Sequence, residues 1–278
     1  MTSSCWLRTV TFICLLGSGN CAPTGNSSSI SPNETTVLEP PAGFGLQTVP
    51  LPNTSSMEDA VKLQVQTAQS SLRRSIEDPA TTPGGLGQAY GNMANLLMAA
   101  RDLDAAEPYY LNAQALAPNN RQWSYYLGHL YRNKGPLEEA VANFEHARQL
   151  APNDVATLVW LGEVYLSLGQ SEQAQPLFQH AVTINEMSAA AWFGLGRAAL
   201  NANDFSAAVT SLERALAINP QATAIHYPLG LALRGIGNAE RAEAHLEQQG
   251  NIEAHPVDPL MWELDNQLQS VQAFKGRA

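Results

Sequence analysis

The stretch WLGEVYLSLGQSEQAQPLFQHAV, at residues 160–182, decides the fold of this chain. A Leu-Gly pair at 161–162 is followed by Tyr165, and Ala174 is followed four residues later by Phe178. The same spacing returns before and after this stretch with a period of 34 residues. The stretch is therefore one copy of an internal repeat, and each of its residues is interpreted by its position within that repeat.

Five consecutive blocks carry the pattern in one phase: residues 87–120, 121–154, 155–188, 189–222 and 223–256. Small residues occupy the eighth and twentieth positions, where two helices can approach closely, and large residues mostly occupy the seventh, eleventh and twenty-fourth. The fifteenth position, where a left-handed residue can end a helix, holds Gly135, Gly169, Asn203 and Gly237. Arg101 takes this position in the first block, so we expect a less regular turn there.

The blocks resemble the tetratricopeptide repeat (TPR), whose unit has the same length and the signature W-x2-L-G-x2-Y, then A-x3-F and a closing proline. The resemblance covers residues 87–256. It implies an all-α fold, a right-handed α-α superhelical solenoid of about five TPR helix pairs with flanking helices. The last block, with DPLM at 258–261, also resembles the ends of such arrays in exported bacterial proteins.

Residues 1–21 are typical of a signal peptide or a lipoprotein signal. One basic residue, Arg8, precedes an apolar run at 9–17 that is too short to cross a bilayer. Cys21 is the candidate lipidation site, although Ser18 and Asn20 depart from the residues usual before an acylated cysteine. The alternatives are a lipoprotein anchored through Cys21, a soluble exported protein and an uncleaved leader. We expect export, to a periplasmic or membrane-anchored location.

Residues 22–56 are rich in proline, serine and threonine and contain no lysine or arginine, which predicts a flexible linker. The apolar side chains of this linker that can dock on the folded part are Phe44, Leu46, Val49 and Leu51. Helical spacing from residue 57 onward predicts an N-terminal capping helix within residues 57–86. The sequence DPATTPGG at residues 78–85 breaks the helical pattern.

Residues 257–278 follow the array and predict a C-terminal capping helix or the first helix of a truncated sixth repeat. Asp258 can cap such a helix, and Pro259 suits its first turn. Its apolar face consists of Leu260, Met261, Leu264, Leu268, Val271 and Phe274. Because a repeat array leaves the face of its last repeat exposed, we favour a helix that covers this face.

The composition argues against most catalytic and nucleic-acid-binding functions. A formal net charge of −10 and the lack of a basic run disfavour binding to phosphates. All three cysteines lie within the first 21 residues, so no thiolate site is expected in the repeats. The histidines form neither H-x3-H nor HExxH, and no phosphate-binding loop occurs. We therefore predict no enzyme activity, no catalytic residue, no metal and no cofactor.

The resemblance implies that the first helix of each repeat lines a concave groove through its second, fifth, ninth and twelfth positions. The candidate partner-binding residues at these positions are Tyr125, His129, Arg132, Val159, Glu163, Phe193, Arg197, Tyr227 and Arg234. Aromatic rings beside arginines suit a protein or peptide partner, as an extended or helical segment with apolar and acidic groups. In the alternative, His129, Glu163 and Arg197 form an internal ladder, and the rings pack on adjacent repeats.

The predicted function is a non-enzymatic protein-protein interaction scaffold or adaptor in the cell envelope, an inference by analogy with the fold. One alternative is an accessory subunit of an enzyme system, for example of glycosyltransferase type, whose catalytic domain is on another chain. Another is a structural array that assembles with itself through its C-terminal end. The identity of the partner and the oligomeric state stay open.

Overall fold

The computed structural model describes residues 37–55, 57 and 59–275, with side chains as far as residue 267. The predicted leader, Cys21 and the first part of the predicted linker lie outside the described residues. None of the helices that the structure describes is both long enough and apolar enough to cross a membrane.

The elements follow one another in chain order as β1 (Val37–Leu38), β2 (Val49–Pro50), α1 (Asp59–Glu77), α2 (Pro83–Ala99), α3 (Leu103–Leu116), α4 (Arg121–Lys134), α5 (Leu137–Leu150), α6 (Val155–Ser167), α7 (Ser171–Ile184), α8 (Ala189–Asn201), α9 (Phe205–Ile218), the 3-10 helix η1 (Thr223–Ile225), α10 (His226–Gly235), α11 (Ala239–Leu246) and α12 (Pro259–Lys275).

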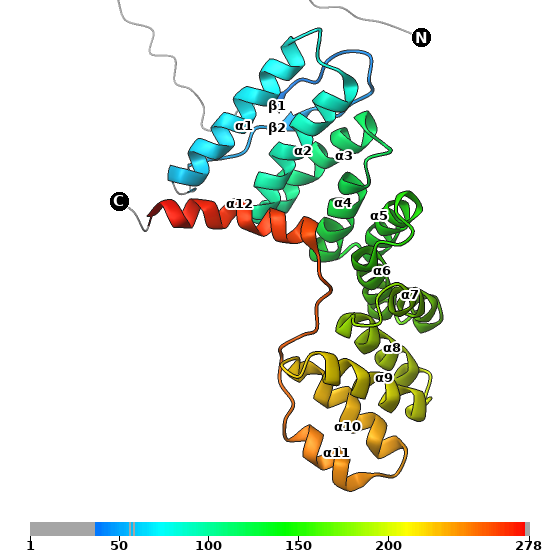
Figure 1. The fold of residues 1–278 in the computed structure, drawn as a ribbon. Coiled ribbons are helices and arrows are strands. Elements are labelled where there is room, and N and C mark those ends of the chain that lie inside the picture. The colour runs from blue at the N-terminus through cyan, green and yellow to red at the C-terminus, as the bar shows by residue number, and fades with distance from the viewer. Residues whose placement is uncertain (1–36, 56, 58, 276–278) are drawn as a thin grey trace, which may run out of the picture. The chain divides into compact units, whose positions relative to one another are not determined.

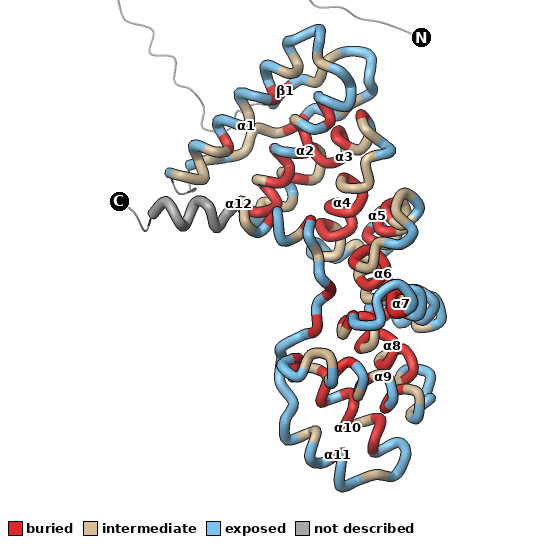
Figure 2. Tube along the Cα trace, in the orientation of Figure 1, coloured by how far each residue is buried: buried red, intermediate tan, exposed pale blue. Residues whose placement is uncertain are grey.

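Consecutive helices from α2 to α11 form five hairpins, and each hairpin packs against the next (Figure 1). Buried residues lie where the two helices of a hairpin face each other and where neighbouring hairpins meet (Figure 2). This arrangement confirms the predicted all-α solenoid of five helix pairs with flanking helices.

The eighth position of the repeat brings the two helices of a hairpin into close contact. In the four repeats that have glycine at this position, a Cβ atom would lie within 2.8 Å of the side chain at the twenty-fourth position of the same repeat. The facing pairs are Gly128 with Phe144, Gly162 with Phe178, Gly196 with Leu212 and Gly230 with Leu246. The predicted alternation of small and large residues is therefore the packing that closes each hairpin.

The fifteenth position ends the first helix of each hairpin in a left-handed conformation. The backbone angle φ is 109° at Gly135, 73° at Gly169, 60° at Asn203 and 83° at Gly237. Arg101 adopts the same conformation, with φ of 64°, so the prediction of a less regular turn there is wrong. The Asp102 N–H donates to the Leu97 carbonyl at 2.9 Å, a bond that three later turns also make. This helix-ending bond helps to offset the roughly 1 kcal/mol that a left-handed conformation costs a residue with a Cβ atom.

Part of the predicted linker packs against the array. Strands β1 and β2 pair antiparallel, with Leu38 opposite Val49, and the Val49 side chain is fully buried. Leu46 and Leu51 are partly buried against the same core, whereas Phe44 is half exposed. The docking expected for this segment therefore occurs, except at Phe44.

Side chains of α3 hold this segment through its backbone. Asn112 accepts a hydrogen bond from the Gln47 N–H and donates one to the Gln47 carbonyl, both at 2.8 Å. The Tyr109 hydroxyl donates to the Pro50 carbonyl, also at 2.8 Å. The prediction of a flexible linker is therefore wrong for residues 37–51, because the array supplies the partners that its backbone needs on leaving water.

Helix α1 packs against α2, as expected of an N-terminal capping helix. Helix α1 ends at Glu77, and α2 begins at Pro83. The Thr82 hydroxyl caps α2 by accepting a hydrogen bond from the Gly85 N–H at 3.1 Å. The first hairpin thus starts inside the segment 57–86 that was expected to hold only the capping helix.

Helix α12 does not cover the last repeat. It packs against α2 and α1 at the other end of the array, away from α11 (Figure 1). Leu260 and Leu264 are buried in the core that the N-terminal repeats form. The predicted helix is therefore present, but its predicted position at the end of the last repeat is wrong. The side chains of Leu268, Val271 and Phe274 lie outside the described side chains.

We predict that Gly194→Ala destabilises the array. The Phe178 ring is fully buried between Gly194 and Gly162, and a Cβ atom on Gly194 would lie 2.2 Å from it. Because Gly162 blocks the ring from moving away, we expect the free energy of unfolding in urea to fall by about 1–3 kcal/mol. Gly84→Ala is the matched control, since a Cβ atom on this exposed residue meets nothing within 4 Å. Equal stability of the two variants would contradict the packing described above.

Two histidines pack together in the last hairpin. The Nδ1 atoms of His226 on α10 and His245 on α11 lie 2.9 Å apart, so one imidazole donates a hydrogen bond and the other accepts it. Burial lowers the pKa of both. For His245 the neighbouring His226 and Arg241 lower the pKa further, and Glu213 opposes them.

We predict that acid destabilises this hairpin. The pKa values of His226 and His245 are lower in the folded chain than in the unfolded chain, so the unfolded chain binds protons first as the pH falls. The contribution of this histidine pair to stability is therefore complete above the unfolded pKa of about 6.5 and declines below it. The free energy of unfolding should therefore be lower at pH 5.5 than at pH 7.5. His245→Gln removes one titrating group and should make this dependence on pH shallower. An unchanged slope in the variant would show that the histidine pair is not responsible.

Candidate functional site

The inner helices α4, α6, α8 and α10 carry all of the predicted partner-binding residues. The structure does not combine these residues into one continuous groove. Residues 250–258, here named the strap, lead from α11 back to α12 and cross the face that α4, α6 and α8 present (Figure 1). The strap separates the predicted residues into three groups.

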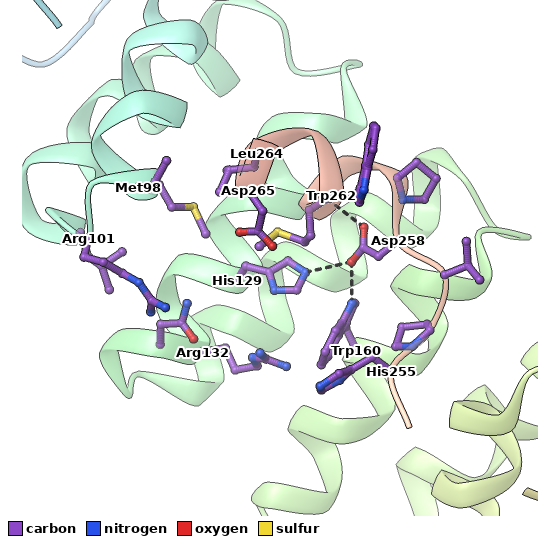
Figure 3. A pocket seen from close by; sticks show the side chains of 17 residues that line it. Met98, Arg101, His129, Arg132, Trp160, His255, Asp258, Trp262, Leu264 and Asp265 are labelled. Carbon is purple, nitrogen blue, oxygen red and sulfur yellow. Dashed lines mark hydrogen bonds and ion pairs between the residues drawn. The ribbon is translucent and has the colours of Figure 1, made fainter. Parts of the chain in front are cut away.

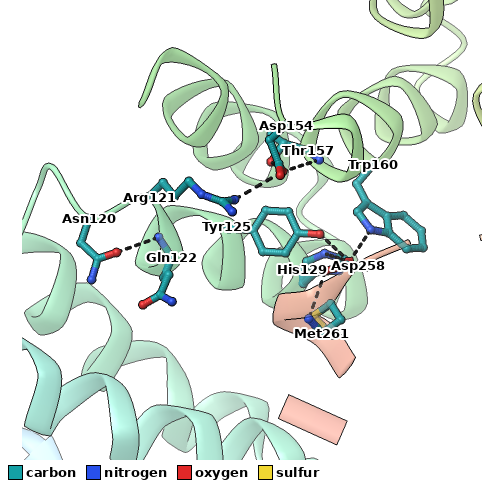
Figure 4. Close-up of polar contacts among 10 residues, drawn as sticks. All are labelled: Asn120, Arg121, Gln122, Tyr125, His129, Asp154, Thr157, Trp160, Asp258 and Met261. Carbon is teal, nitrogen blue, oxygen red and sulfur yellow. Dashed lines mark hydrogen bonds and ion pairs between the residues drawn. The ribbon is translucent and has the colours of Figure 1, made fainter. Parts of the chain in front are cut away.

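The first group lies beneath Asp258, the last residue of the strap. The Tyr125 hydroxyl donates a hydrogen bond to Oδ2 of Asp258 at 2.5 Å, and the Trp160 indole N–H donates to the same oxygen at 2.8 Å (Figure 4). The other carboxylate oxygen, Oδ1, accepts from the Met261 N–H at 3.1 Å. Asp258 therefore caps α12, as the sequence predicts, and also joins this helix to α4 and α6.

Burial keeps Tyr125 and His129 uncharged. It raises the pKa of the Tyr125 phenol well above its usual value, and the charge of Asp258 raises it further, so the hydroxyl remains a donor. Burial also lowers the pKa of His129 well below its usual value, and Arg132 adds to this shift. The His129 Nε2 atom is 3.9 Å from Oδ2 of Asp258 and has no hydrogen-bond partner. This contact is an ion pair only when the imidazole is protonated, which the lowered pKa of His129 disfavours.

The His129 ring is enclosed by aromatic side chains. Its centroid lies 4.8 Å from that of Tyr125, 5.1 Å from that of Phe144 and 5.2 Å from that of Trp160, and each pair is edge-on. Tyr125 thus packs within the repeats, as the alternative prediction expected of the aromatic rings, and His129 packs beside it. They are not open to a partner while the strap is in place.

The second group lines a pocket of about 450 Å³ between the inner helices and the strap. It consists of Arg132, Val159, Glu163, Phe193 and Arg197. Arg197 forms an ion pair with Glu163, and its guanidinium carbon lies 5.4 Å from the centre of the Phe193 ring. The expected ladder is therefore present between Glu163 and Arg197, whereas His129 lies next to Asp258 instead.

Arg132 also faces a second, larger pocket of about 960 Å³ between α2, α4 and α12 (Figure 3). Its guanidinium carbon lies 4.1 Å from the centre of the Trp160 ring. Burial lowers the pKa of Arg132, and the charge of Glu163 opposes that shift. An arginine stays charged in such surroundings, so it offers a cation backed by an aromatic ring to both pockets.

The third group consists of Tyr227 and Arg234 on α10, both exposed and neither lining these two pockets. The described residues contain no cluster of three histidine, cysteine or acidic side chains that could hold a metal ion.

Sequence reasoning missed Trp160 as a groove residue and missed the role of Asp258 in the groove. Trp160 occupies the sixth position of its repeat, which was not among the expected groove positions. Asp258 meets Trp160 across 98 residues and Tyr125 across 133 residues of sequence. No local pattern signals a contact over such distances.

Three family models match the chain, and each describes a tetratricopeptide repeat. One matches residues 87–120, one matches 119–187, and the third matches 161–223 and 194–251. No curated protein matches the sequence.

Solved TPR structures resemble the chain at low sequence identity. The crystal structure of MamA protein is 21% identical, covers 58% of this chain and 88% of its own, and has a TM-score of 0.55. YrrB, described as a TPR protein with an unusual peptide-binding site, is 22% identical, covers 76% of this chain and 99% of its own, and also has a TM-score of 0.55. MamA of Desulfovibrio magneticus RS-1 is 21% identical, covers 76% of this chain and 98% of its own, and has a TM-score of 0.50.

These likenesses show the fold alone. The family models together span residues 87–251, more than half of the chain, and they fall on the helical hairpins that the structure shows. The chain therefore belongs to the tetratricopeptide repeat family.

Proposed function

We propose that the chain is a non-enzymatic interaction scaffold whose inner helices bind a segment of a protein partner. The observation that carries this proposal is the strap, because α4 and α6 already hold a peptide segment, the chain's own, through the carboxylate of Asp258. A surface that pairs the polar groups of one peptide can pair those of another. The peptide-binding site named for YrrB, a protein of the same fold, supports this proposal.

The chemistry of the groove favours a partner segment with acidic and apolar groups. Arg132 offers a positive charge to the pockets on both sides of the strap, and the Trp160 ring lies against it. Met98 and Leu103 of the first repeat add apolar surface to the larger pocket. A chain with a net charge of −10 is a poor match for nucleic acid, so the proposed partner is a protein or peptide.

We also propose that the chain is exported and tethered to a membrane through an acylated Cys21, on the basis of its leader-like first 21 residues. Mass spectrometry of the protein purified from a bacterial host should find a mature N-terminus at Cys21 carrying acyl chains. Unmodified cleavage near this position would favour a soluble exported protein. An intact Met1 would contradict cleavage and acylation at Cys21.

Photo-crosslinking tests whether a partner occupies the groove. Ser167 on α6 is exposed and lines the 450 Å³ pocket, whereas Gln179 is exposed on α7, an outer helix. A photoreactive residue at Ser167 should crosslink a specific protein, and one at Gln179 should not. Equal labelling from the two sites would contradict binding in the groove.

We predict that Arg132→Glu lowers the yield of the Ser167 crosslink about tenfold. The substitution places a negative charge opposite an acidic partner, and a lost charge-assisted hydrogen bond is worth about 1.5–3 kcal/mol. Arg214→Glu makes the same charge change on the exposed face of α9 and should leave the yield unchanged. Circular dichroism would confirm that both variants remain helical.

A further inference from the structure

The strap is fixed at its two ends and has few buried side chains between them. At its start the Ala224 N–H donates to the Ile252 carbonyl at 3.0 Å, and the Gly250 N–H donates to the Thr223 carbonyl at 3.2 Å. At its end Asp258 binds Tyr125 and Trp160. Between these anchors only Ala254 and Pro256 are buried, and the side chain of Val257 is 87% exposed. The middle of the strap therefore adds little apolar burial to the contact, and the buried apolar side chains of the segment are Leu260 and Leu264 in α12.

The two pockets of the groove are parts of one trough that the strap divides. Both pockets are lined by Arg132 and Trp160 from the inner helices and by His255 and Pro256 from the strap. The pockets lie on opposite sides of this crossing, one toward α2 and α12 and one toward α8. Removal of the strap would join them over a common floor of Arg132 and Trp160.

Beneath the strap, two hydrogen-bond donors meet one carboxylate oxygen. The Tyr125 hydroxyl and the Trp160 indole N–H converge on one oxygen of Asp258 (Figure 4). A segment that covers Tyr125 in place of the strap but lacks an acceptor would leave this hydroxyl buried and unpaired, which is a costly state. A negatively charged acceptor pairs with both donors and also interacts with the charge of Arg132. We therefore expect a segment that replaces the strap to supply a carboxylate at this point.

We propose that residues 250–267 are a displaceable intramolecular ligand of the groove. The external partner is a segment with the same chemistry, an aspartate or glutamate at the start of a short apolar helix, as in the chain's own Asp258, Pro259, Leu260 and Met261. This inference rests on the proposed function, since it states what the scaffold binds and how access is controlled. The tethered segment competes with the partner, so the apparent affinity equals the intrinsic affinity multiplied by the fraction of chains in which the groove is open.

The test uses the full chain and a fluorescent peptide with the sequence of residues 250–267. Asp258→Asn in the chain weakens the attachment of its own segment and leaves Tyr125, Trp160 and Arg132 in place. Fluorescence anisotropy should show that the peptide binds this variant at least about tenfold more tightly than the parent chain, the ratio expected for one charge-assisted hydrogen bond. A peptide with asparagine at the position of Asp258 should bind the variant at least about tenfold more weakly than the aspartate peptide.

Asp265→Asn is the matched control. Asp265 lies two turns further along α12, is exposed and lines the same 960 Å³ pocket. This variant should bind the peptide no more tightly than the parent chain. Hydrogen exchange should accelerate at the amides of residues 259–267 in Asp258→Asn but not in Asp265→Asn. Unchanged exchange in α8 and α9 would show that the repeats remain folded.

Three results would overturn the proposal: equal binding of the peptide to the parent and Asp258→Asn chains, unchanged exchange in α12 of that variant, or equal binding of the two peptides. The scaffold function fails separately. The Ser167 crosslink could form and depend on Arg132 while the peptide binds the parent and Asp258→Asn chains equally. In that case only the competition by the strap is wrong. If the peptide binds the Asp258→Asn chain more tightly than the parent chain but no partner is crosslinked, the groove binds only the chain's own segment.

Discussion

The close approach of the two helices in each hairpin constrains every other part of the structure. A glycine at the eighth position of the repeat leaves the space that a phenylalanine or leucine from the twenty-fourth position fills, as Phe144 does against Gly128. A buried ring in contact with a backbone cannot shift without loss of packing, so the distance between the helices is set by these residues. Because successive hairpins share this spacing, they stack in one phase and present equivalent positions on the same face.

This stacking explains how the groove acquires a site that no single repeat contains. Tyr125 and Trp160 occupy neighbouring positions in successive repeats, and the stacking of α4 and α6 directs their polar hydrogens at one point. Asp258, which follows the last repeat in the sequence, supplies the acceptor. Two donors held on rigid helices select for a charged oxygen more strongly than flexible side chains would, because little side-chain freedom is lost on binding.

The same physics holds the segments at both ends of the repeats. Residues 37–51 lie against α3 because Asn112 and Tyr109 pair with the backbone of Gln47 and Pro50. The strap lies against the inner helices because Tyr125 and Trp160 pair with Asp258. In both places polar side chains of the array satisfy groups of a segment whose own composition would leave it in water.

The amino-acid sequence by itself determined the repeats, their helix pairs and the turns at Gly135, Gly169, Asn203 and Gly237, because these depend on contacts within 34 residues or between adjacent copies. It also determined that Asp258 caps a helix, since that bond reaches only to Met261. Only the tertiary structure decided that the helix packs on α2 and that Tyr125 and His129 are covered. These outcomes depend on contacts between residues far apart in the chain, such as Tyr125 and Asp258 across 133 residues, and such contacts leave no periodic pattern in the sequence.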